Sequence, residues 1–113
     1  MLRRWILAAG VALTLATGAQ AAEVKVYTAG SMLEPLRAVG DRFTRRTGHT
    51  LVFVAGTTGV IQSRLRAGER ADLVVVSAEG LEALRGEGRL EAAPSRVLAR
   101  SVLGVAVRAG AAR

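Results

Sequence analysis

Short apolar runs alternate with longer amphipathic segments through most of this chain. The apolar runs, which have the composition of strands, are residues 24–29, 51–54, 73–76 and 102–107. The amphipathic segments, which have helical spacing, are residues 32–47, 60–67 and 78–85. Glycine, the usual residue at a helix stop, follows these segments at Gly48, Gly68 and Gly86. This alternation predicts an α/β fold, a three-layer αβα lobe with a mostly parallel sheet.

The first 21 residues have the parts of an export signal. Arg3 and Arg4 form a basic start, an uncharged apolar stretch follows, and Ala19-Gln20-Ala21 has the small-x-small pattern that signal peptidase reads. The apolar stretch is shorter than the roughly 20 residues of a membrane span, which favours cleavage over retention as an anchor. We therefore expect a periplasmic protein whose signal peptide, residues 1–21, is cleaved after Ala21.

Composition limits the chemistry that the chain can perform. No cysteine is present, which excludes a disulfide framework and a thiolate metal site, and His49 is the single histidine. Two of the 16 basic residues belong to the leader, so 14 remain against 9 acidic ones, and the net charge falls from +7 to +5. These charges are scattered, which favours small anions over nucleic acid as partners. We expect no cofactor and no resident metal.

Small and hydroxyl-bearing residues follow the first three predicted strands. Gly30 and Ser31 follow the first strand, Thr57 and Thr58 follow the second, and Ser77 follows the third. In parallel sheets the carboxyl ends of the strands share one edge, where ligands bind. Each turn also opens a helix, whose first N–H groups are unpaired and favour anions. These turns therefore predict an anion site made of neutral donors.

Ser31 has two competing roles. With Glu34 it matches the capping box S-x-x-E, in which Ser31 caps its own helix. Pro35 disfavours that start, because it cannot donate a hydrogen bond to the Ser31 carbonyl. A helix that begins one or two residues later would free Ser31 for a ligand. The residues alone leave both roles open.

The other polar residues near these turns have simpler explanations. One of the two threonine hydroxyls, of Thr57 or Thr58, caps the second helix and leaves the other available, while Ser77 is expected to act only as an N-cap. Asp72 is expected to have a structural role, and His49 to be a solvated turn residue. The turn "GTTGV" is no phosphate-binding P-loop, because Gly-Lys-Ser/Thr is missing.

Three stretches of this chain resemble the periplasmic molybdate-binding proteins, the substrate-binding subunits of ABC importers. They are "VKVYTAGSMLEPLRAVGDRFTRRTGHTLVF", "AGTTGVIQSRLRAGERADLVVVSAEGLEAL" and "ARSVLGVAVRAG". The resemblance implies the fold of a type 2 periplasmic binding protein, a monomer that delivers its ligand to a membrane permease. It also implies that residues 22–113 are part of the first of two lobes, with the second lobe absent.

The same resemblance implies a ligand and a set of site residues. Ser31 falls on the serine that binds the oxyanion, and Thr58 falls on the hydroxyl residue of the second turn, with Thr57 as the alternative. Backbone N–H groups at the two helix starts, around Gly30, complete the half-site. Threonine replaces the usual serine, so it adds a methyl group. The implied ligand is a tetrahedral oxyanion, molybdate or tungstate.

Other functions remain as alternatives. One alternative is a binding protein of the same fold whose ligand is phosphate, sulfate or a chelated metal. Another is a fragment that binds nothing, which is consistent with the length of the chain. An enzyme needs a nucleophile with a base, or paired carboxylates, at the same edge. His49 precedes the second strand and belongs to the opposite end, while capping explains Glu34 and Glu79. We therefore expect a binding protein and no catalysis.

Overall fold

The computed structural model describes residues 20–91 and 94–111. Residues 1–19, which make up most of the predicted signal peptide, lie outside the described residues. The strands are β1 (Glu23–Ala29), β2 (Thr50–Gly56) and β3 (Leu73–Val75). The helices are the short 3-10 turn η1 (Gly30–Met32), α1 (Leu33–Thr47), α2 (Thr58–Arg66) and α3 (Ala78–Gly86). Each helix in the described residues falls short of the length and apolar character that a membrane span requires.

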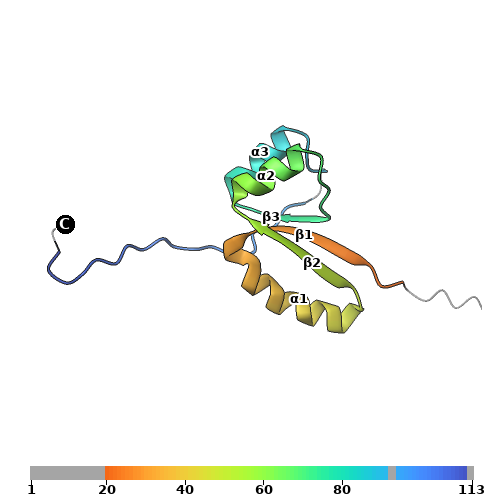
Figure 1. The fold of residues 1–113 in the computed structure, drawn as a ribbon, viewed down its shortest axis with the longest axis horizontal. Helices are drawn as coiled ribbons and strands as arrows, with labels where there is room; N and C mark the ends of the chain where they lie inside the picture. The colour runs from red at the N-terminus through yellow and green to blue at the C-terminus, as the bar shows by residue number, and fades with distance from the viewer. Residues whose placement is uncertain (1–19, 92–93, 112–113) are drawn as a thin grey trace, which may run out of the picture.

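The three strands form one parallel sheet in the order β2-β1-β3. Figure 1 shows α1 on one face of this sheet and both α2 and α3 on the other face. Parallel strands joined by crossover helices require such layers, because a connection between parallel neighbours has to cross a face of the sheet. The predicted α/β fold with three αβα layers is confirmed.

The face of the sheet beneath α2 and α3 carries a closed hydrophobic core. Tyr27 of β1 packs there with Ile61 and Leu65 of α2 and Leu84 of α3, all of them buried. Val54 and Val74 share this face, because each is the register partner of Tyr27 in a neighbouring strand. Two helices and the central strand are therefore held together by one cluster.

The opposite face is covered by α1 alone. Gly40 is buried where α1 meets β2, and a Cβ built at this position would lie 2.9 Å from Leu51 Cδ1 and 3.4 Å from Phe53 Cζ. Val39 of α1 keeps 64% of its surface exposed, and Phe43 keeps 37%. The apolar stripe of α1 is thus only partly covered by the strands.

Two of the three predicted glycine stops are confirmed. Gly48 and Gly68 have the left-handed φ angles of 76° and 98°, which side chains with a Cβ rarely adopt. The third stop is two residues later than predicted, because Gly86 is the last residue of α3 and Gly88 has the left-handed φ of 66°.

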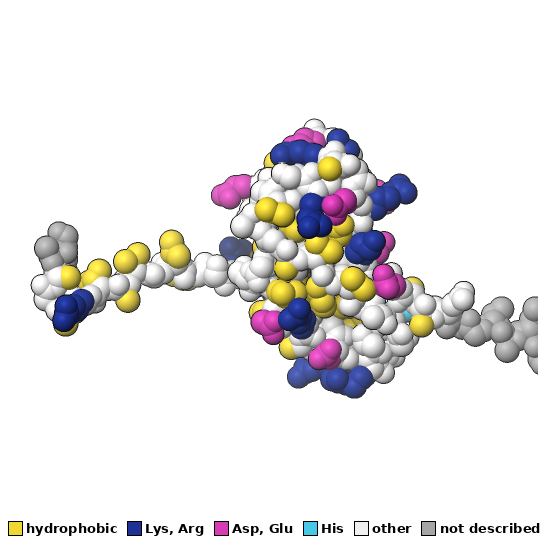
Figure 2. Space-filling model, viewed as in Figure 1, with side chains coloured by type: hydrophobic (Ala, Val, Ile, Leu, Met, Phe, Trp, Pro, Cys, Tyr) yellow, Lys and Arg dark blue, Asp and Glu magenta, His cyan; other side chains and the backbone are white. Residues whose placement is uncertain are grey.

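The predicted fourth strand at residues 102–107 is not formed. Residues 94–111 contain no helix or strand, and Val102 and Val105 are 96% and 87% exposed. An extended segment becomes a strand only when its backbone groups pair with a neighbour. This segment extends away from the sheet (Figure 1), and Figure 2 shows that its hydrophobic side chains are exposed to solvent. An apolar β-branched composition was therefore insufficient to predict pairing.

Candidate functional site

The turns after β1 and β2 lie side by side at the carboxyl edge of the sheet. Ala29 and Gly56, the last residues of the two strands, are register partners. Gly30 directly follows β1 and lies close to the second turn. A Cβ built on Gly30 would lie 3.9 Å from the Gly56 carbonyl oxygen. The structure therefore brings Gly30–Ser31 and Thr57–Thr58 to one place, as the order of elements predicted.

Ser31 does not cap α1. It lies in η1, and α1 begins at Leu33 with Met32 as its N-cap, which makes no side-chain capping bond. Glu34, the other member of the predicted capping box, instead bonds Arg37 with an Oε1 to Nη1 distance of 2.8 Å. Pro35 sits in the first turn, where a missing N–H leaves no intrahelical bond unmade. The exposed Ser31 hydroxyl is consequently available to a ligand.

The structure separates the roles of the two threonines. Thr57 is the N-cap of α2, and its hydroxyl accepts a hydrogen bond from the Val60 N–H at 3.2 Å. Thr58 is the first residue of α2 and is partly buried. The hydrogen bonds among the described residues include none from the Thr58 hydroxyl. Thr57 thus caps α2 as an acceptor, whereas the Thr58 hydroxyl makes no hydrogen bond within the described part of the chain.

Ser77 is the N-cap of α3, as predicted. Its hydroxyl accepts a hydrogen bond from the Gly80 N–H at 3.2 Å. The helices α2 and α3 meet at this point, because the Gln62 side chain donates to the Gly80 carbonyl at 3.4 Å. The starts of both helices, with the positive ends of their dipoles, therefore face the same edge of the sheet.

The loop between α2 and β3 is tied to β1 on both sides. Asp72 accepts the Lys25 N–H at 2.8 Å and returns its own N–H to the Lys25 carbonyl at 2.9 Å. The Tyr27 hydroxyl donates to Glu69 at 2.6 Å, and Arg64 Nη1 lies 3.3 Å from the same carboxylate. The predicted structural role of Asp72 is confirmed, although its partner is 47 residues away and not local.

Hydrogen bonding shifts the pKa values of the Tyr27–Glu69 pair in opposite directions. The bond to Glu69, followed by burial and the carboxylate charge, raises the pKa of Tyr27 above 10.0. The same bond, helped by Arg64, holds the pKa of Glu69 below 4.5 although burial opposes it. The Glu69 role was not predicted, because no local pattern connects it to a tyrosine 42 residues earlier.

His49 is held in the structure, contrary to the expectation of a solvated turn residue. Its Nδ1 accepts a hydrogen bond from the Ala22 N–H at 3.0 Å, and its ring lies beside Phe43 with centroids 6.1 Å apart. A half-buried ring with a backbone partner fixes the start of β1. His49 precedes β2, whereas Ser31 follows β1, so the two lie at opposite ends of the parallel strands.

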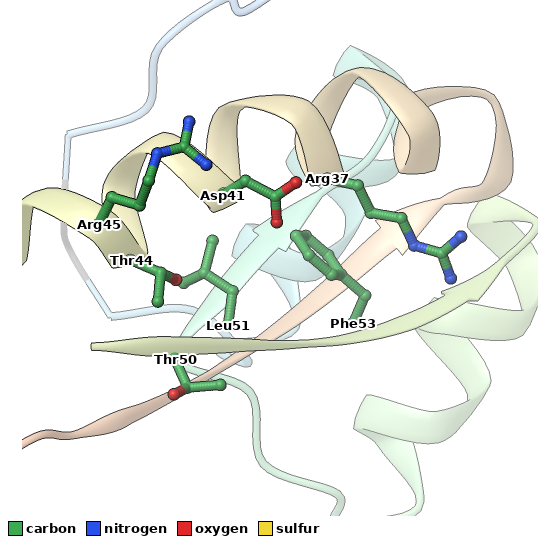
Figure 3. Close-up of a pocket in the computed structure, with 8 residues that line it drawn as sticks. Arg37, Asp41, Thr44, Arg45, Thr50, Leu51 and Phe53 are labelled. Carbon is green, nitrogen blue, oxygen red and sulfur yellow. The ribbon is translucent and has the colours of Figure 1, made fainter. Parts of the chain in front are cut away.

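A hollow of about 360 Å³ lies elsewhere, between α1 and the outer strand β2. Figure 3 shows Leu51 and Phe53 rising from β2 toward α1, which supplies the charged residues Asp41 and Arg45. The lining includes none of the hydroxyl residues at the carboxyl edge. Within the described residues, no three histidine, cysteine or acidic side chains are grouped as metal ligands. The candidate site is thus an open edge with neutral donors.

Comparison with known proteins places this chain in a class of proteins that bind solutes. Residues 24–113 match the family model of the bacterial extracellular solute-binding proteins. This chain belongs to that family. The resemblance that the sequence motifs indicated is thereby confirmed.

Two relatives are more specific. Over 67 residues the chain is 37% identical to the molybdate-binding protein ModA of Azotobacter vinelandii, a match that covers 59% of this chain and 26% of that protein. The structure is similar to the substrate-binding domain assigned to a molybdenum ABC transporter of Clostridium difficile, with a TM-score of 0.55 and 17% identity. That likeness covers 59% of this chain and 30% of the other, and it shows the fold alone.

Proposed function

We propose that this chain forms part of the ligand site of an extracytoplasmic solute-binding protein that serves an ABC importer. The proposed ligand is a tetrahedral oxyanion, molybdate or tungstate. The observation that carries the proposal is the pair of uncommitted hydroxyls, of Ser31 and Thr58, at the adjoining ends of β1 and β2. The family match and the molybdate-binding relative support it.

The proposed chemistry is binding by neutral donors. A dianion at this edge accepts hydrogen bonds from the Ser31 and Thr58 hydroxyls and from backbone N–H groups near Gly30 and at the start of α2. The α2 dipole adds attraction without a lysine or arginine contact. Neutral donors fixed by short turns discriminate by size and geometry, because they offer no mobile charge that any anion would attract.

The remaining parts of the proposal concern the whole protein. We propose that the protein is exported and delivers its ligand to a membrane permease. The leader pattern of residues 1–21 and the family match support this proposal. The chain spans 26% of the molybdate-binding relative, so further donors for the ligand are expected outside the matched part. We therefore expect weak binding by the 113 residues alone.

Substitution of Ser31 tests the site. We expect Ser31→Ala to weaken molybdate binding by about 1–3 kcal/mol, the cost of leaving one polar partner unpaired. Isothermal titration with molybdate, with sulfate and phosphate as competitors, measures this loss and the choice of anion. Ser63→Ala is a matched control, because Ser63 is an exposed residue in the middle of α2. Equal affinities of the Ser31 and Ser63 variants would contradict the proposed role of Ser31.

A further inference from the structure

Gly80 is buried at a close contact between α3 and the first residue of α2. A Cβ atom built on Gly80 would lie 2.3 Å from Thr58 Cγ2, far inside the distance at which two carbon atoms touch. It would also lie 3.3 Å from Ser77 Oγ and 3.5 Å from Gln62 Nε2. The Thr58 methyl group therefore occupies the space that any larger residue at position 80 would need.

The place of this methyl group determines where the Thr58 hydroxyl lies. Both γ atoms of threonine are attached to one Cβ in staggered positions, so fixing the methyl group fixes the oxygen as well. Within helices threonine divides between two χ1 rotamers. Glycine at position 80 leaves room for the rotamer that places the methyl group against α3. A serine at position 58 has no methyl group and would not be oriented by this contact.

We propose that Gly80 is a positioning residue, which orients the Thr58 hydroxyl toward the oxyanion by leaving room for the Thr58 methyl group. The part of this inference that concerns affinity rests on the proposed function. The part that concerns the rotamer does not. The pairing of threonine at 58 with glycine at 80 keeps a hydroxyl donor in one direction despite the extra methyl group.

The contact predicts a specific pattern of compensation. Gly80→Ala forces the Thr58 methyl group to move, which turns the hydroxyl away and lowers molybdate affinity by about tenfold, the loss of one hydrogen bond. In Gly80→Ala/Thr58→Ser the obstructing methyl group is gone. We therefore expect the double variant to bind molybdate within about twofold of Thr58→Ser alone, a coupling between neighbours that separate sites would not show.

Two measurements on the 113-residue chain test the inference. Titration with molybdate gives the affinities, and three-bond NMR couplings to the Thr58 methyl carbon give its χ1 rotamer without any ligand. We expect a changed coupling in Gly80→Ala. Gly86→Ala is the matched control, because it lies in the same helix and an added Cβ there meets no atom within 4 Å. This control should leave coupling and affinity unchanged.

The outcomes separate this inference from the proposed function. Unchanged couplings in Gly80→Ala overturn the inference, and so does a loss of affinity that Thr58→Ser fails to compensate. If Gly80→Ala unfolds, folding of the double variant supports the methyl contact, whereas unfolding of both variants contradicts it. If Ser31→Ala binds molybdate as tightly as Ser63→Ala does, the proposed site fails, while the couplings still decide the role of Gly80.

Discussion

On the α2 and α3 side of the sheet Ile61 and Leu84 are completely buried, whereas on the α1 side Val39 and Leu73 keep 64% and 48% of their surface exposed. Both sides share the central strand β1, whose Val26 and Tyr27 point to opposite faces and are both buried. The difference comes from the number of helices. Two helices cover one face, and a single helix covers the other (Figure 1).

Because of this difference, the two turns of the candidate site are attached to parts of the molecule that are packed unequally. Thr58 and Ser77 stand at the starts of the helices that form the closed core. Gly30 and Ser31 lead from the buried strand β1 into α1, on the more open face. We therefore expect changes in the closed core to reduce stability strongly and to disturb the Thr58 turn, while changes on the open face have small effects.

The largest expected effect comes from the closed core. Leu84→Ala should lower the free energy of unfolding by about 2–5 kcal/mol, because it removes buried methyl groups and leaves a cavity between α3 and the sheet. Leu73→Ala, on the open face, should cost at most about 1 kcal/mol, since half of that side chain already contacts water. Urea unfolding followed by circular dichroism measures both. Equal losses would show that the two faces are packed alike.

Much of this architecture was predictable from local patterns. Apolar runs and helix-stop glycines placed three strands and three helices within a few residues of their observed bounds, because each element carries its own periodicity. The segment 102–107 has the same composition as a buried strand, yet it is unpaired. Pairing depends on a neighbour in space, and composition within six residues contains no information about that neighbour.

The candidate site was predictable only in part. The order of elements brought Ser31 and Thr58 to one edge, but the start of α2 decided which threonine hydroxyl accepts the capping hydrogen bond. A shift of one residue exchanges the roles of Thr57 and Thr58, and helix bounds are the least certain part of a sequence-based prediction. The contact of Gly80 with Thr58 joins residues of two helices, so it required the packed structure.

An intermediate effect is expected from the link between β1 and the loop before β3. Tyr27→Phe removes the donor to Glu69 while keeping the buried ring, so it should reduce stability less than Leu84→Ala does. Because the pKa of Glu69 is lowered in the folded state, the stabilisation is present above pH 4.5 and is lost as pH falls through that lowered pKa. Because the pKa of Tyr27 is raised, the stabilisation is also lost as pH rises above 10.0.

Unfolding curves across this pH range test the link. We expect the difference between the parent chain and Tyr27→Phe to be constant between these limits and to shrink at both ends. Glu69→Gln is a suitable control, because it keeps an acceptor for the tyrosine but cannot titrate. A difference that is independent of pH would mean that the hydroxyl contributes through packing and not through the carboxylate.

The smallest effect is expected at the far end of the closed face, where Arg66 of α2 holds Glu87 after α3 through two bonds of 2.8 and 2.6 Å. Arg66→Lys replaces this two-point contact by a single charge, so the melting temperature should fall slightly. The variant also loses the hydrogen bonds from Arg66 that lower the pKa of Glu87. The pair is partly exposed, and in about 1 M NaCl, where the screening length is about 3 Å, the loss should vanish. Arg85→Lys is the matched control, because Arg85 makes one contact, with Glu82 at 3.0 Å, within α3. A loss that persists in high salt would assign the effect of Arg66 to packing of its aliphatic stem.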